Sequence, residues 1–142
     1  MTIYFDTLPN GIKVLTEEIP TIESVSVGVW IGVGSRNENK NESGIAHFLE
    51  HMAFKGTEKR SALQIAESIE NVGGFINAYT SKEITCYYAK ILKDDLPLAV
   101  DILSDIISNS VYKKEEIERE KGVIIQEIGQ IRDTPDEFIF EL

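Results

Sequence analysis

Residues 47–51 read His-Phe-Leu-Glu-His, and they contain the only two histidines of the chain. On an α-helix, positions i, i+3 and i+4 share one face, so His47, Glu50 and His51 are expected to converge beside the helix. Two neutral imidazoles can bind zinc, and a carboxylate beside them can accept a proton from a water that the metal activates. The motif therefore predicts a helical metal site in which Glu50 acts as a general base.

A hydrolytic zinc site needs a third protein ligand and one open position for water. No histidine is left, and the single cysteine, Cys86, is far from the motif in sequence, so a carboxylate is expected. Glu127, 76 residues after His51, is the best candidate, and Glu120 lies seven residues before it. On one helix these two side chains lie within roughly 20° of each other. Spacing alone does not say which of them binds the metal and which orients a ligand.

These residues also have ordinary structural explanations, because partly buried helical histidines and solvated glutamates are common. Finding the only two histidines four positions apart, around a glutamate, favours the metal site. A purely structural zinc site is disfavoured, since such sites use four protein ligands and prefer cysteine. Nitrogen and oxygen ligands would also admit manganese or cobalt.

The sequence around the motif resembles a known family. Residues 43–57 read SGIAHFLEHMAFKGT, residues 73–87 read GGFINAYTSKEITCY, and residues 120–127 read EKGVIIQE. These stretches resemble the pitrilysin-type zinc metallopeptidases, which carry the inverted H-x-x-E-H motif. Within that family the similarity is greatest to the branch that holds the catalytic β subunit of mitochondrial processing peptidase and its bacterial relatives. The resemblance covers nearly the whole chain.

This resemblance implies a role for each candidate residue. His47, His51 and Glu127 match zinc ligands, Glu50 matches the general base, and Glu120 matches a helping acid beside the ligands. The implied activity is that of a zinc-dependent endopeptidase that cleaves peptides or presequence-like segments. The alternative is a non-catalytic core or scaffold subunit of the same family, but such relatives have lost part of the motif, and all five positions are intact here.

The resemblance also implies a peptide-binding region. An extended peptide could add to a sheet edge at residues 75–80, where Asn77 and Ala78 match positions that serve this purpose in the family. Phe54 matches a residue that lines the pocket just after the cleaved bond, although an ordinary core aromatic would fit the same pattern.

At 142 residues the chain has the size of one domain. Family members consist of two similar halves, each longer than this chain, so residues 1–142 are expected to form the N-terminal part of the zinc-binding peptidase domain. The second half, which closes over the substrate in the family, would then be missing. Residues 134–142 begin like a helix and end without a stop signal. Such a fragment is expected to be a poor enzyme by itself.

Composition limits the setting and the partners. A net charge of −10 disfavours nucleic acid and anionic membranes as partners. A single cysteine suits a reducing compartment, and Cys86 is predicted to be a buried structural thiol. No apolar run is long enough to span a membrane, and the N-terminus lacks the features of a signal or transit peptide. A bacterial cytoplasm or the mitochondrial matrix is expected, with a homodimer or a non-catalytic partner subunit as possible assemblies.

The pattern of apolar residues predicts an α+β fold, with one mostly antiparallel sheet covered by helices. A hairpin is expected around Asn10-Gly11, and Ser43 is expected to cap the metal-binding helix. The expected strands are 3–8, 12–18, 24–34, 75–80 and 84–92, with 24–34 in the centre of the sheet. The expected helices are 43–55, 61–72, 96–108 and 114–132.

Overall fold

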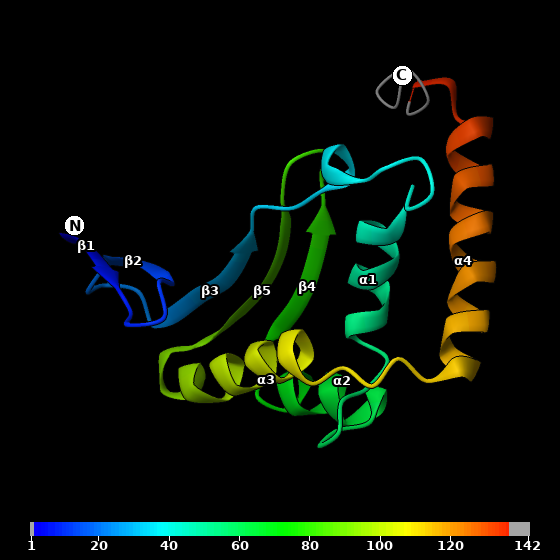
Figure 1. Ribbon diagram of the computed structural model, residues 1–142. Coiled ribbons are helices and arrows are strands. Elements are labelled where there is room, and N and C mark those ends of the chain that lie inside the picture. The colour runs from blue at the N-terminus through cyan, green and yellow to red at the C-terminus, as the bar shows by residue number, and fades with distance from the viewer. Residues whose placement is uncertain (1, 137–142) are drawn as a thin grey trace.

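The computed structural model describes residues 2–136 of the chain, and it confirms an α+β fold with antiparallel strands (Figure 1). Each helix and strand predicted between residues 3 and 132 is present in the predicted order. The strands are β1 (Thr2–Thr7), β2 (Lys13–Glu18), β3 (Ser24–Ile31), β4 (Phe75–Thr80) and β5 (Thr85–Leu92). The helices are α1 (Ile45–Ala53), α2 (Ala62–Glu70), α3 (Leu96–Ser108) and α4 (Lys114–Asp133), with single 3-10 turns at Ser35–Asn37 and Lys93–Asp95.

The N-terminal hairpin forms as predicted but does not join the main sheet. Strands β1 and β2 pair antiparallel from Thr2 opposite Glu18 to Thr7 opposite Lys13. They form a separate two-stranded sheet whose residues are all exposed, and Figure 1 shows it projecting away from the other strands. The prediction of one compact sheet was therefore wrong. Alternating apolar residues indicate a strand, but they do not indicate which layer will cover its apolar face.

The main sheet has three antiparallel strands in the order β3-β5-β4, so the central strand is β5. The prediction that residues 24–34 form the central strand was wrong. Burial explains the difference, because most of β5 is buried whereas Val29 and Trp30 of β3 are exposed. Strand β4 pairs only with β5, which leaves its other edge without a strand neighbour among residues 2–136.

The apolar core lies where α2 and α3 pack against this sheet. Ile65 and Ile69 of α2 meet Ile102 and Ile106 of α3, and all four are at most 1% exposed. Burying a side chain of this size contributes about 1.5–3 kcal/mol of stability. Cys86 of β5 is 1% exposed, which confirms the predicted buried thiol.

Helix α1 begins differently from the prediction. Ser43 is not its N-cap; the capping position is Gly44, with a left-handed backbone (φ 89°, ψ 2°) that favours glycine. The free N–H groups at this end are bound instead by Glu38, whose carboxylate accepts hydrogen bonds from Gly44 N (2.7 Å) and Ala46 N (2.8 Å). A cap that comes from six residues before the capping position is not visible as a local sequence pattern.

The remaining predicted helix boundaries hold to within about two residues. Helix α2 begins after Ser61, which forms a reciprocal capping box with Gln64. The predicted helix over residues 134–142 falls mostly outside the described residues; of these, Pro135 and Asp136 are helical. Within residues 2–136, no helix is both long enough and apolar enough to cross a membrane.

Helices α1 and α4 build the part of the molecule that matters for function. Figure 1 shows α1 standing beside β4, and α4 running alongside α1 on the side away from the sheet. These two helices are separated by some sixty residues of chain. Their packing brings the His-x-x-Glu-His motif close to the distal glutamates.

Candidate metal centre

Three predicted ligands meet between α1 and α4. His47 and His51 lie one helical turn apart on α1, and Glu127 approaches them from α4. The Nε2 atoms of the two histidines are 3.1 Å apart, and Glu127 Oε2 lies 3.7 Å from His47 Nε2 and 3.6 Å from His51 Nε2. This arrangement brings one nitrogen or oxygen atom from each residue to within 4.8 Å of the others.

The spacing of these atoms suits a small tetrahedral cation. Zinc with bonds of about 2.0–2.1 Å to nitrogen and oxygen holds neighbouring ligand atoms about 3.4 Å apart. The observed separations of 3.1, 3.6 and 3.7 Å lie close to that value. Three ligands leave the fourth position of a tetrahedron open, as a hydrolytic site requires. The residues present therefore fit zinc.

Glu120 lies behind His51 rather than beside Glu127. Its Oε2 is 3.1 Å from His51 Nδ1, and its Oε1 is 2.7 Å from Lys55 Nζ. The residue is only 2% exposed. Burial raises the pKa of the Glu120 carboxyl, but the hydrogen bonds from Lys55 and His51 lower it by more, so its pKa lies below the ordinary value.

An ionised Glu120 decides which His51 nitrogen can bind a metal. A carboxylate only accepts hydrogen bonds, so His51 Nδ1 must donate to it. In a neutral imidazole this leaves the lone pair on Nε2, the nitrogen that faces His47 and Glu127. Glu120 would thereby orient His51 for a metal without itself joining the three residues that face one another.

Lys55 is a site residue that the sequence interpretation missed. It lies four residues after His51 and two residues beyond the last residue of α1, and it provides the cation that pairs with buried Glu120. The spacing of four residues from His51 was a usable signal, because side chains so spaced near a helix end can lie close together. The pairing could not be inferred without knowing that Glu120 is buried.

Glu50 lies next to the three ligands but outside their group. Its Oε2 atom is buried and has no hydrogen-bond partner among the described residues. Buried polar atoms are nearly always paired, so this oxygen is available to a molecule that enters the site.

The pKa of Tyr87 is raised to about 12, first by burial and then by the negative charge of Glu50, so Tyr87 keeps its proton at neutral pH.

The residues predicted to contact a peptide lie on β4, which packs against α1, and directly after α1. Asn77 is exposed on β4, the edge strand, and its Oδ1 accepts a hydrogen bond from Ala78 N (2.9 Å). The Ala78 side chain belongs to the core, so only the backbone of Ala78 could contact a peptide. Phe54 follows α1 directly and packs against the core, with its ring 6.3 Å from that of Tyr87.

Comparison with known proteins identifies the family of the chain. Residues 13–142 match the family described as Insulinase (Peptidase family M16). The chain belongs to peptidase family M16. It is 48% identical over 136 residues to an uncharacterized zinc protease of Bacillus subtilis, which covers 96% of this chain and 33% of that protein. It is 52% identical over 134 residues to the mitochondrial-processing peptidase subunit beta of Saccharomyces cerevisiae, which covers 94% of this chain and 29% of that protein.

A solved structure supports the same fold. The chain superimposes on a crystal structure of a protease from Helicobacter pylori with a TM-score of 0.84 and 32% identity, over 89% of this chain and 30% of that one. The chain thus spans about a third of the length of the relatives it matches. Zinc, the expected cofactor, is confirmed for the family by the names of its bacterial members.

Proposed function

We propose that this chain carries the zinc centre of an endopeptidase, in which His47, His51 and Glu127 hold the metal and Glu50 is the general base. The observation that carries the proposal is the convergence of three metal-binding side chains from two helices beside a buried, unpartnered carboxylate oxygen. Four protein ligands, as a structural zinc site would use, are not found among residues 2–136.

The side chains divide the work of peptide hydrolysis among them. Zinc, when bound, polarises the attacking water and the scissile carbonyl. Glu50 accepts the proton of that water and then passes it to the nitrogen of the leaving amine. Glu120 accepts a hydrogen bond from His51 Nδ1 and so holds the ring in the orientation that a ligand needs.

The substrate is proposed to be an extended peptide that pairs with the free edge of β4. Asn77 and the backbone of Ala78 would contact this peptide, and Phe54 would line the pocket for the residue after the cleaved bond. The net charge of −10 favours encounter with cationic peptides. Presequence-like segments fit that description, and one relative is named a mitochondrial-processing peptidase.

The wider setting is part of the same proposal. Residues 1–142 would be the N-terminal part of the peptidase domain, working with further peptidase sequence and with a second copy or a non-catalytic partner subunit. The interior of a bacterial cell or the mitochondrial matrix suits a chain with one buried cysteine. The alternative, a non-catalytic scaffold subunit, is less well supported because every residue of the proposed site is present.

Substitution of Glu50 by Gln tests the catalytic role against the scaffold role. The amide cannot accept the proton, so cleavage of a peptide mixture should fall at least about 100-fold while zinc content stays unchanged. Glu42→Gln, an exposed glutamate just before α1, serves as the matched control and should cleave at the normal rate. A Glu50→Gln protein that cleaves peptides normally would remove Glu50 as the base. Loss of zinc in that variant would instead make Glu50 a ligand.

A further inference from the structure

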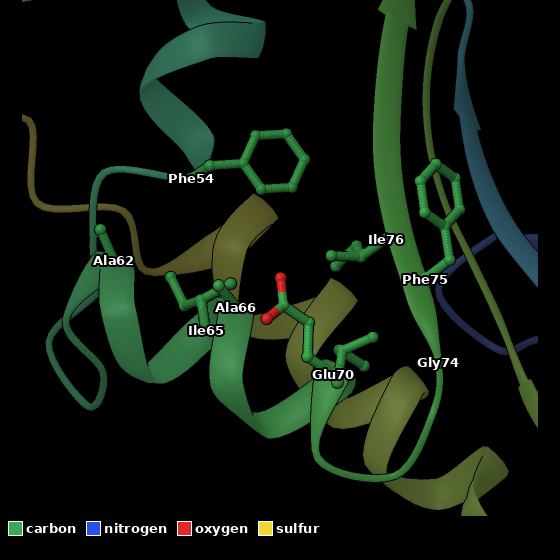
Figure 2. A pocket seen from close by; sticks show the side chains of 9 residues that line it. Phe54, Ala62, Ile65, Ala66, Glu70, Gly74, Phe75 and Ile76 are labelled. Atoms are coloured by element: carbon green, nitrogen blue, oxygen red, sulfur yellow. The ribbon is translucent and has the colours of Figure 1, made fainter.

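A pocket lies beyond the C-terminal end of α1, between α2 and the start of β4. Its volume is about 330 Å³, at the lower end of the range of about 300–1,000 Å³ that ligand pockets occupy. Phe54 closes one end, α2 forms the floor, and residues 74–76 form the opposite wall (Figure 2). Gly74 allows this wall to approach α2, because a Cβ there would lie 3.0 Å from Ile69 Cγ2.

The pocket is positioned to receive a side chain of the peptide proposed above. Phe54 is three residues after His51, or about 4.5 Å along a helix, and Ile76 directly precedes Asn77. Helix α1 runs toward the pocket, and β4 runs away from it (Figure 1). A peptide that pairs antiparallel with β4 therefore passes the metal centre first and the pocket afterwards. The pocket would hold a residue on the C-terminal side of the cleaved bond.

The lining is apolar apart from one carboxylate. Phe54, Ile65 and Ile76 provide apolar surface, whereas Glu70, the last residue of α2, provides the only charge. Figure 2 shows the Glu70 carboxylate directed into the space between these three side chains. Glu70 is exposed to solvent at the edge of this space, and within residues 2–136 its carboxylate forms no ion pair and no hydrogen bond.

We propose that Glu70 makes this pocket selective for a lysine or arginine residue of the substrate, after the cleaved bond. These side chains combine an apolar stem with a cationic end, which matches an apolar passage that ends at a carboxylate. An uncharged aliphatic residue would fill the passage but leave Glu70 unpaired, and an acidic residue would be repelled. This inference rests on the proposed endopeptidase function and adds a specificity determinant to it.

The test compares peptides that differ at one position. Once mass spectrometry has located a bond that the zinc-loaded protein cleaves, lysine, norleucine or glutamate is placed at each of the first three positions after it. At one of these positions, kcat/KM for the lysine peptide should exceed that for the norleucine peptide about five- to tenfold. Glu70→Gln should bring this ratio to about one. Glu70→Lys should instead favour the glutamate peptide.

Glu67 provides the matched control, because like Glu70 it is an exposed glutamate of α2, but it does not line the pocket. Glu67→Gln should keep the wild-type ratio. Equal cleavage of lysine and norleucine peptides by the wild-type protein, or an unchanged ratio in Glu70→Gln, would overturn the role of Glu70 and leave the endopeptidase function standing. These assays use residues 1–142 together with the further peptidase sequence and partner proposed above, and failure of that assembly to cleave any peptide would instead overturn the proposed function, and this inference with it.

Discussion

The buried carboxylate of Glu120 joins two side chains that the proposed mechanism depends on. One of its oxygens contacts His51 Nδ1 and the other contacts Lys55 Nζ. Carboxylates that orient metal-binding histidines are typically worth 10–100-fold in metal affinity. Lys55 contributes indirectly, by fixing the position and charge of Glu120.

Substituting Lys55 by Met should weaken zinc binding roughly tenfold, because Glu120 would lose its cation and its hold on His51 would loosen. Competition with a fluorescent zinc chelator measures this affinity directly. Lys59→Met is the control, since Lys59 is exposed and has no ion pair among the described residues. Equal zinc affinity in the Lys55→Met and Lys59→Met proteins would show that Lys55 does not act through Glu120.

At the scale of single residues, the sequence predicted much of the candidate centre. His47, Glu50 and His51 could be placed together because helical geometry fixes their relative positions. The choice between Glu120 and Glu127 could not be made from spacing, since both occupy one side of α4. The structure places Glu127 near both Nε2 atoms and Glu120 at the opposite nitrogen of His51. Their roles as ligand and helper stay proposals.

The N-terminal end of α1 depends on one carboxylate from outside the helix. Glu38 binds the N–H groups of Gly44 and Ala46, where the helix dipole also favours negative charge. Glu38→Ala should therefore destabilise the fold by about 1 kcal/mol, which corresponds to about 3 °C in a chain of this size. Thermal unfolding followed by circular dichroism measures the shift.

Glu42→Ala is the control for this prediction, because Glu42 forms only an exposed hydrogen bond with Asn39. It should unfold within about 1 °C of the wild-type protein. Equal melting temperatures for the Glu38→Ala and Glu42→Ala proteins would contradict the assignment of Glu38 as the cap of α1.

A second connection fixes the loop after α1 to helix α3. Asp105 is 2% exposed and accepts hydrogen bonds from Thr57 Oγ1 (2.7 Å), Asn109 Nδ2 (2.9 Å) and Arg60 Nη1 (2.8 Å). Burial raises the pKa of Asp105, but the hydrogen bonds from Thr57, Asn109 and Arg60 lower it by more, so it lies below its ordinary value of 3.8. The ionised form is thus the one that stabilises the fold.

The lowered pKa of Asp105 makes the stability of the fold fall as the pH is lowered. The stabilisation by Asp105 is fully present above the unfolded-state pKa and is lost as the pH falls through the lower folded-state pKa. Asp105→Asn should cost about 1–3 kcal/mol at pH 6, and the difference from wild type should shrink below about pH 4. Urea unfolding at a series of pH values measures the free energy of unfolding of both proteins and hence this difference. Asp101→Asn, at the exposed partner of Arg60, should show a much smaller effect, and equal costs for the two variants would contradict the prediction.

At the scale of elements, local patterns predicted the helices and strands well but not the contacts between them. The predicted start at residue 61 agrees with the observed start of α2, where Ser61 and Gln64 form a capping box that is a local pattern. The Glu38 cap and the Asp105 network each join residues from different elements, and no local pattern reports them. The same reason explains why Ser43 was wrongly predicted as the cap of α1.

At the scale of the whole molecule, the sequence predicted the α+β class but not the arrangement of the strands. Strand β3 was placed in the centre of the sheet because it is apolar and rich in glycine, yet β5 takes that place.

The hairpin exposes Ile3, Phe5 and Leu15 at its surface. An apolar surface of this kind is typical of an interaction site. The chain spans about a third of the length of its relatives.

The metal centre connects segments that are 76 residues apart in sequence, so its existence is the central claim at this scale. The most direct test is the zinc content of the purified, never-chelated protein, measured by mass spectrometry beside His51→Ala, Glu127→Gln and the control Glu118→Gln. We expect about one zinc per chain in the wild-type and Glu118→Gln proteins, none in His51→Ala and reduced binding in Glu127→Gln. A folded wild-type protein without zinc, or full zinc content in both ligand variants, would contradict the three-ligand site.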